Sequence, residues 1–99
     1  APVNTSAELF QDAWNAYARA LVLEPENPQL INDGAVILQF GLEQDFELAR
    51  AMYQKAQKLA SDALASPDLN ATLRESFGRA LEDARRNEAE LPPRDSKND

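Results

Sequence analysis

Two stretches of the chain, 36 residues apart, carry the same pattern of aromatic and small side chains. They read "FQDAWNAYARALVL" from position 10 and "FELARAMYQKAQKL" from position 46. The matched pairs are Phe10/Phe46, Ala13/Ala49, Tyr17/Tyr53, Ala20/Ala56 and Leu23/Leu59. Spacings of three and four residues place these side chains on one side of a helix, where alanines beside an aromatic ring let a neighbouring helix approach. The repeat therefore predicts stacked helical units.

Helix signals divide the chain into four segments, and no stretch alternates as a strand does. Thr5 and Glu8 form a capping-box pattern, Asn27-Pro28 and Ser66-Pro67 are N-cap and first-turn pairs, and Asp45 is a further N-cap. Gly41 is expected to end the second helix, and Pro92 and Pro93 follow the fourth. The predicted helices span about 6–23, 28–41, 46–65 and 67–90.

Short connections make consecutive helices antiparallel, so the predicted fold class is all-α, built from helix–turn–helix hairpins. We expect one domain over residues 6–91, preceded by an N-terminal segment (1–5) and followed by a disordered polar tail (92–99).

From about Leu9 to Leu64 the residues resemble the tetratricopeptide repeat (TPR) family, whose units are helix pairs of about 34 residues. Phe10, Ala13, Tyr17, Ala20, Leu23 and Pro25 match the family's second helix; Ile31, Ala35 and Leu38 match its first helix; and Phe46, Ala49, Tyr53 and Ala56 match a further second helix. The resemblance implies part of a right-handed superhelix with the last helix as a cap, and departs from the family at Gly34 and in the turn after Gly41. It also implies a groove that binds a peptide.

Composition and charge narrow the function. The 99 residues include no cysteine or histidine, which removes the usual zinc sites and His-activated nucleophiles. The net charge is −7, and up to Ala49 the only base is Arg19, so nucleic acid is not expected as a partner while a basic protein or peptide is. No apolar run is long enough for a membrane span. We expect a soluble chain that needs no cofactor; the sequence leaves its compartment undetermined and favours the cytoplasm.

Individual side chains do not predict catalysis or a metal site. Trp14 fits a core or interface position better than a ligand-stacking one, and Tyr17 and Tyr53 are structural because they repeat. The acids around Pro25, and those from Glu43 to Glu47, lack the alternating carboxylate spacing of a calcium loop. Catalytic, cofactor-binding and metal residues are therefore predicted to be absent, and the chain is not expected to be an enzyme.

Two surfaces are predicted instead. The second helix presents a face that is either a partner-binding groove or simply solvated, formed by Gln29, Asn32, Asp33, Val36, Gln39 and Phe40. The first helix carries an apolar stripe that would pack against an upstream repeat or a second copy, formed by Phe10, Trp14, Tyr17 and Leu21.

The sequence thus predicts a non-catalytic scaffold that binds a partner protein or peptide. The alternative is a C-terminal cap or self-association module of a larger repeat protein. We expect a longer parent chain or a homodimer, because so few repeats rarely fold alone.

Overall fold

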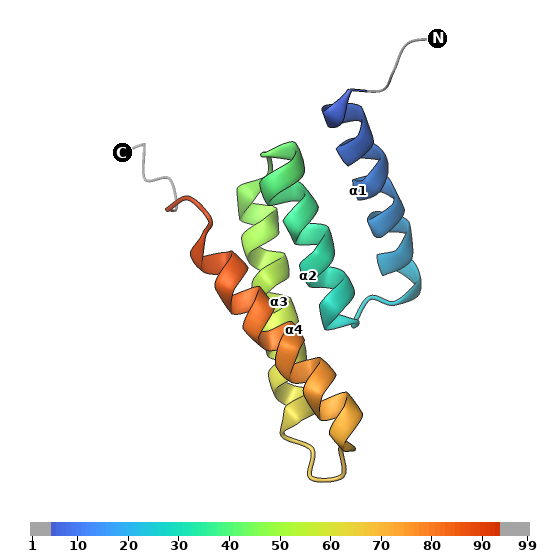
Figure 1. Cartoon of the computed structure of the whole chain (residues 1–99), viewed down its shortest axis with the longest axis vertical. Helices are drawn as coiled ribbons and strands as arrows, with labels where there is room; N and C mark the ends of the chain where they lie inside the picture. Colours follow the sequence, from blue (N-terminus) through green and yellow to red (C-terminus); the bar gives the residue numbers. More distant parts are fainter. Residues whose placement is uncertain (1–4, 94–99) are drawn as a thin grey trace.

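Residues 5–93, which the computed structural model describes, form four α-helices and no strand. The helices are α1 (Ser6–Leu23), α2 (Pro28–Val36), α3 (Phe46–Leu64) and α4 (Ala71–Ala89), and α2 continues into the π-helical segment η1 (Ile37–Leu42). Consecutive helices fold back on one another as hairpins, and α2 lies between α1 and the α3–α4 pair (Figure 1). The predicted all-α class with four helices is confirmed.

The first two helices begin where the sequence predicts. Thr5 and Glu8 form the complete capping box, with the Glu8 N–H donating to Thr5 Oγ1 at 3.1 Å and the Thr5 N–H donating to Glu8 Oε1 at 2.7 Å. Asn27 caps α2 by accepting the Leu30 N–H at 3.1 Å, and Pro28 occupies the first helical position. These caps satisfy backbone donors that a helix start leaves without partners.

The predicted start of the fourth helix at position 67 is wrong. Asn70 is the N-cap, and its side chain accepts the Leu73 N–H at 2.8 Å. The guanidinium of Arg74 donates to the carbonyls of Leu64 and Ser66, at 3.2 and 3.1 Å. Because these bonds satisfy carbonyl groups at the end of α3, the segment around Ser66 stays in the loop.

Gly41 does not end the second helix as predicted. The helical path runs through η1 to Leu42 and stops at Glu43, which is left-handed with φ of 53°. Asp45 also has a positive φ, and it precedes α3 without a capping hydrogen bond from its side chain. The structure uses Gly41 for packing: a Cβ at that position would lie 2.5 Å from Cδ1 of Phe10.

The centre of the fold is formed where α2, α3 and α4 meet. Tyr53 and Leu38 are its largest fully buried side chains. Around them the buried positions are mainly alanines, which let the helices approach closely: Ala35, Ala49, Ala56, Ala60, Ala80 and Ala84. The alanines that the repeat placed beside Tyr53 thus lie in the core.

The backbone of α1 approaches only α2 and η1 among the described elements (Figure 1). Its rings cover two glycines, with Phe10 over Gly41 and Trp14 over Gly34. A Cβ at Gly34 would lie 3.5 Å from Cζ3 of Trp14 and 3.2 Å from Cε of Met52 on α3. The departure from the TPR pattern at Gly34 therefore makes room for side chains from both neighbouring helices.

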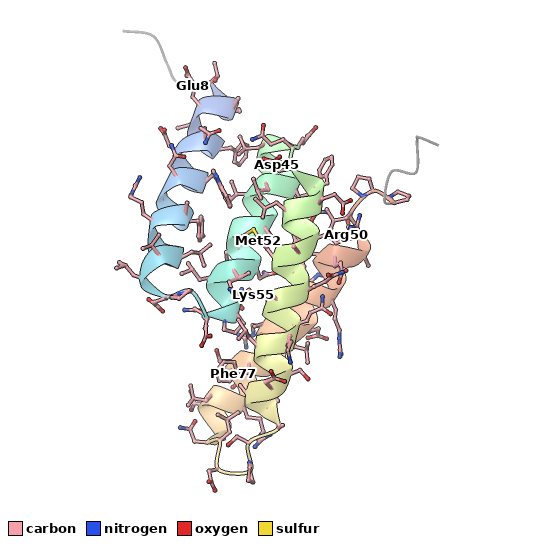
Figure 2. All side chains as sticks on the ribbon, turned by 180° about the vertical axis from the view of Figure 1, so that it is seen from behind. Glu8, Asp45, Arg50, Met52, Lys55 and Phe77 are labelled. Carbon is pink, nitrogen blue, oxygen red and sulfur yellow. The ribbon has the colours of Figure 1, made fainter. Side chains whose placement is uncertain are left out.

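The chain after α4 is held for a short distance. Leu91 is buried, and an Arg50 guanidinium N–H donates to the Pro92 carbonyl at 2.7 Å. Arg50 is labelled on α3 in Figure 2. The predicted disordered tail (92–99) is thus wrong at Pro92, while its last six positions, and positions 1–4 of the predicted N-terminal segment, lie outside the described residues.

We expect Gly41→Ala to destabilise the fold by about 1–3 kcal/mol, since the added methyl group must displace the Phe10 ring or move η1. Gly78→Ala is the matched control: no atom lies within 4 Å of the added Cβ, so the change should stabilise α4 by about 0.5–1 kcal/mol. Urea unfolding followed by circular dichroism measures both. Equal effects of the two substitutions would contradict the Phe10–Gly41 contact.

Candidate functional site

The six residues of the predicted groove separate into exposed and buried sets. Four follow one another at spacings of four, three and four residues and remain accessible to solvent: Gln29, Asp33, Val36 and Phe40. Phe40 has half of its surface exposed. These four side chains form a continuous line along α2 and η1, as the helical spacing requires.

The other two predicted groove residues are part of the interior. Asn32 is 3% exposed, and its Oδ1 accepts a hydrogen bond at 3.2 Å from Asn87 Nδ2 on α4. Gln39 is 5% exposed, and its Oε1 accepts a 2.7 Å hydrogen bond from the Tyr53 hydroxyl. Both amides therefore join helices to one another and are not displayed to a partner.

Two adjoining hollows lie where α4 faces the start of α2. The larger, of about 480 Å³, is lined by the α1–α2 corner and α4: Glu24, Pro25, Glu26, Asn27, Pro28, Ser76 and Phe77. The smaller, of about 380 Å³, is lined by Gln29 of α2 and by α4: Thr72, Glu75, Ser76, Arg79 and Asp83. Ser76 borders both hollows, so we treat them as one depression, the α2–α4 groove.

Acidic side chains outnumber basic ones around this groove. Glu24 and Glu26 border one hollow, while Glu75 and Asp83 border the other with Arg79 as the one base among the lining residues. Arg79 is paired with Glu75 at 3.4 Å on the exposed surface. The lining therefore carries a net negative charge, which favours a cationic ligand.

An aromatic side chain supplies the apolar part of the groove. Phe77, labelled on α4 in Figure 2, is half-buried and lines the larger hollow beside Pro25 and Pro28. An acidic rim around an aromatic and two prolines can hold a chain that carries both basic and apolar side chains.

The apolar stripe of α1, which was predicted to pack against an upstream repeat or a second copy, lies against other helices of the same chain. Phe10 and Trp14 pack on Gly41 and Gly34, Tyr17 lies beside Gly34, and Leu21 packs against the core. The stripe is thus directed at α2 and η1 of the same chain. This corrects the prediction that these four side chains lack a partner within the sequence.

The sequence did not mark α4 as part of a site, because its polar side chains fit an ordinary solvated helix face. The signal that could have found it is Phe77, a large apolar residue next to Ser76 and Gly78 on the accessible part of that helix. Only the position of α4 beside α2 turns these residues into a groove wall.

Neither a metal centre nor a catalytic group emerges from the geometry. Within residues 5–93, no set of three or more acidic side chains is arranged to hold a metal ion. The Tyr53 phenol is buried in the core, and this burial raises its pKa above the ordinary value for tyrosine. Its hydroxyl is bonded to Gln39 inside the core, where no substrate reaches it.

Comparison of the chain with protein-family models, with curated proteins and with solved structures finds no match. The TPR resemblance therefore stays a prediction from the residues. None of the helices in the described range has the length and apolar character that crossing a membrane requires.

We expect Tyr53→Phe to destabilise the fold by about 1–3 kcal/mol at neutral pH, since Gln39 Oε1 loses its buried partner. The difference in stability between the two proteins should shrink as pH rises above about 10. At such pH the Tyr53 phenol ionises in the unfolded chain but stays protonated in the fold, because burial raises its pKa. The wild type therefore loses stability with rising pH, and the variant, which has no phenol at this position, does not. Urea unfolding of both proteins at several alkaline pH values measures this. A Tyr17→Phe variant controls for loss of a phenol, and a gap between wild type and Tyr53→Phe that widens with pH would contradict the assignment.

Proposed function

We propose that the chain is a non-catalytic scaffold of the tetratricopeptide type that binds a basic peptide segment of a partner protein in the α2–α4 groove. The observation that carries the proposal is the groove itself, which combines an acidic lining with the Phe77 ring. Recognition of this kind needs shape and charge complementarity but no chemical step.

The arrangement of the helices supports the repeat part of the proposal. The matched segments form α1 and α3, and each is followed by a helix that packs against it. When α1 is aligned with α3 by the sequence repeat, the helix that follows α1 is α2 and the helix that follows α3 is α4. These two helices therefore occupy equivalent positions in the two repeat units. A right-handed superhelix with α4 as its last helix is the finer architecture that we propose on this basis.

The distribution of polar and apolar side chains supports a peptide ligand in an extended form. The acids Glu24 and Glu26 lie at the α1–α2 corner, and Asp33 follows along α2 before Val36 and Phe40. A segment running beside α2 would meet carboxylates first and an apolar surface afterwards. We therefore propose a ligand with basic residues at one end and an apolar residue at the other.

The inventory of reactive groups favours binding over catalysis. The sequence holds no histidine or cysteine, and the phenol of Tyr53 is enclosed by the core. The carboxylates of the groove rim are spread over two elements, and those of Glu75 and Asp83 are paired with Arg79 and Arg86. Such groups attract cations without being arranged to transfer protons.

We expect a fluorescent peptide with four lysines at one end and a phenylalanine at the other to bind the chain, and the same peptide with glutamates in place of lysines not to bind. Fluorescence anisotropy at about 0.1 M ionic strength measures both. Glu24→Gln/Glu26→Gln should weaken binding by about twofold to thirtyfold, given about 0.2–1 kcal/mol for each of two exposed charge pairs. Adding Phe77→Ala to this double variant should weaken peptide binding further.

The matched control is Asp62→Asn/Asp68→Asn, which removes the same charge from the end of α3 and the following loop. It should change the affinity by less than about twofold, since neither residue lines the groove and salt at about 0.1 M screens charges that lie more than about 10 Å apart. Equal weakening by the two double variants would show attraction to net charge alone and would overturn the groove as the site.

A further inference from the structure

A second surface lies on α1, on the side that does not face α2. Its members follow one another at spacings of four, three, four and three residues: Leu9, Ala13, Ala16, Ala20 and Leu23. Leu9 is 56% exposed and Leu23 is 83% exposed, and α1 contains no buried residue at all. We call these five residues the α1 seam. In Figure 1 α1 forms one edge of the molecule; among the seam residues Leu9, Ala16 and Leu23 are exposed, and Ala13 and Ala20 are half-buried.

The internal repeat provides the central part of the same surface in a covered state. The counterparts of Ala13 and Ala20 on α3 are Ala49 and Ala56, and both are fully buried. The counterpart of Ala16 is Met52, which reaches across to Gly34 of α2. On α3 this side is thus closed by α2, whereas on α1 the equivalent side is open. The pattern of the α1 seam is therefore that of a helix-packing surface.

Within the described chain, no helix is available to cover the α1 seam as α2 covers α3. The side of α2 and η1 that closes α3 consists of Ile31, Ala35 and Leu38, all of which are buried in the core. A second copy of the chain, in contrast, presents a second α1 seam. The question is whether one α1 seam fits another.

The order of side chains in the α1 seam suits antiparallel pairing with itself. Leu9 and Leu23 lie seven residues before and after Ala16, so in an antiparallel pair each leucine meets the opposite leucine of the other copy. The three alanines lie between them and permit a helix separation near the lower end of the usual range of about 8–10 Å. A two-fold axis beside Ala16 produces this self-complementary contact.

The charges beside the α1 seam agree with the same arrangement. Asp12 and Arg19 lie on one flank, two helical turns apart, and Arg19 is the only base before Arg50. Antiparallel pairing brings Asp12 opposite Arg19 of the second copy, and the two-fold axis repeats the pair. Parallel pairing would instead place this flank of one copy opposite the other flank of its neighbour, so the Asp12–Arg19 pair would not form.

From the exposed leucines, the covered counterpart on α3 and the charge pattern, we propose that two copies of the chain associate through antiparallel packing of their α1 seams. The interface leaves Phe10 and Trp14 in their contacts with α2, because these rings lie on the adjacent side of α1. It also leaves the α2–α4 groove open, so it is independent of the proposed peptide ligand.

Sedimentation equilibrium of the whole chain tests the proposal. The average mass should rise from 11.0 kDa toward that of a dimer as the concentration increases to about 1 mM, the Kd scale of a weak complex. Ala16→Glu should remain monomeric, because it buries a charge in the α1 seam. Ala51→Glu is the matched control at an exposed position of α3, and it should associate as the wild type does. Circular dichroism verifies that both variants fold.

Charge exchange tests the orientation of the two helices. Asp12→Arg and Arg19→Asp should each weaken association, by about tenfold at low salt for two altered pairs, whereas the double exchange should restore it. An equimolar mixture of the two single variants should associate as a heterodimer. The proposal is overturned by a wild type that stays monomeric throughout, by association of Ala16→Glu, or by a double exchange that fails to rescue.

Discussion

The packing of the core depends on the contacts of the buried Tyr53 side chain. Its ring lies where α2, α3 and α4 meet, and its hydroxyl donates to Gln39 in η1 at 2.7 Å. A buried polar group is stable only when it is paired, so this bond determines which side chain of η1 turns inward. With Gln39 directed at Tyr53, the neighbouring Phe40 is left half-exposed at the end of the accessible line along α2. The hydrogen bond between Tyr53 and Gln39 in the core therefore determines that Phe40 is exposed on the surface.

The two copies of the repeat have different surroundings, and this difference explains the distribution of surfaces. Tyr53 is enclosed by helices on both sides, while its counterpart Tyr17 has α2 on one side only. In the first copy of the repeat, α1, leucines that fit the helix-packing pattern consequently remain exposed to solvent. Similar amino-acid patterns at α1 and α3 thus have different surroundings: α3 forms the core, and α1 carries the surface that we propose for association. The proposed groove lies on the other side of α2, against α4, so the two surfaces do not compete.

Much of the fold could be predicted from local signals. The capping box at Thr5 and the Asn27-Pro28 corner act within one helical turn, and both were predicted correctly. The start of α4 could not be chosen in this way, since Ser66 and Asn70 are both competent caps. The Arg74 bonds to Leu64 and Ser66 decide between them across a loop. For the candidate site, Gln29 and Asp33 were predicted to be accessible and are. Asn32 and Gln39 were assigned to the same face, but Asn87 and Tyr53 hold them inside.

The sequence by itself determined the helical class, the repeat and the acidic character, because periodicity and composition are properties of the chain alone. Only the tertiary structure decided which side of each helix is covered. An amphipathic stripe specifies that a face will be buried, but the covering element depends on where the chain turns and on how closely backbones approach. Gly34 and Gly41 show this: their sequence context suggested a weak packing position and a helix end, whereas they receive Trp14 and Phe10. That contact directs the predicted stripe inward and leaves the α1 seam exposed.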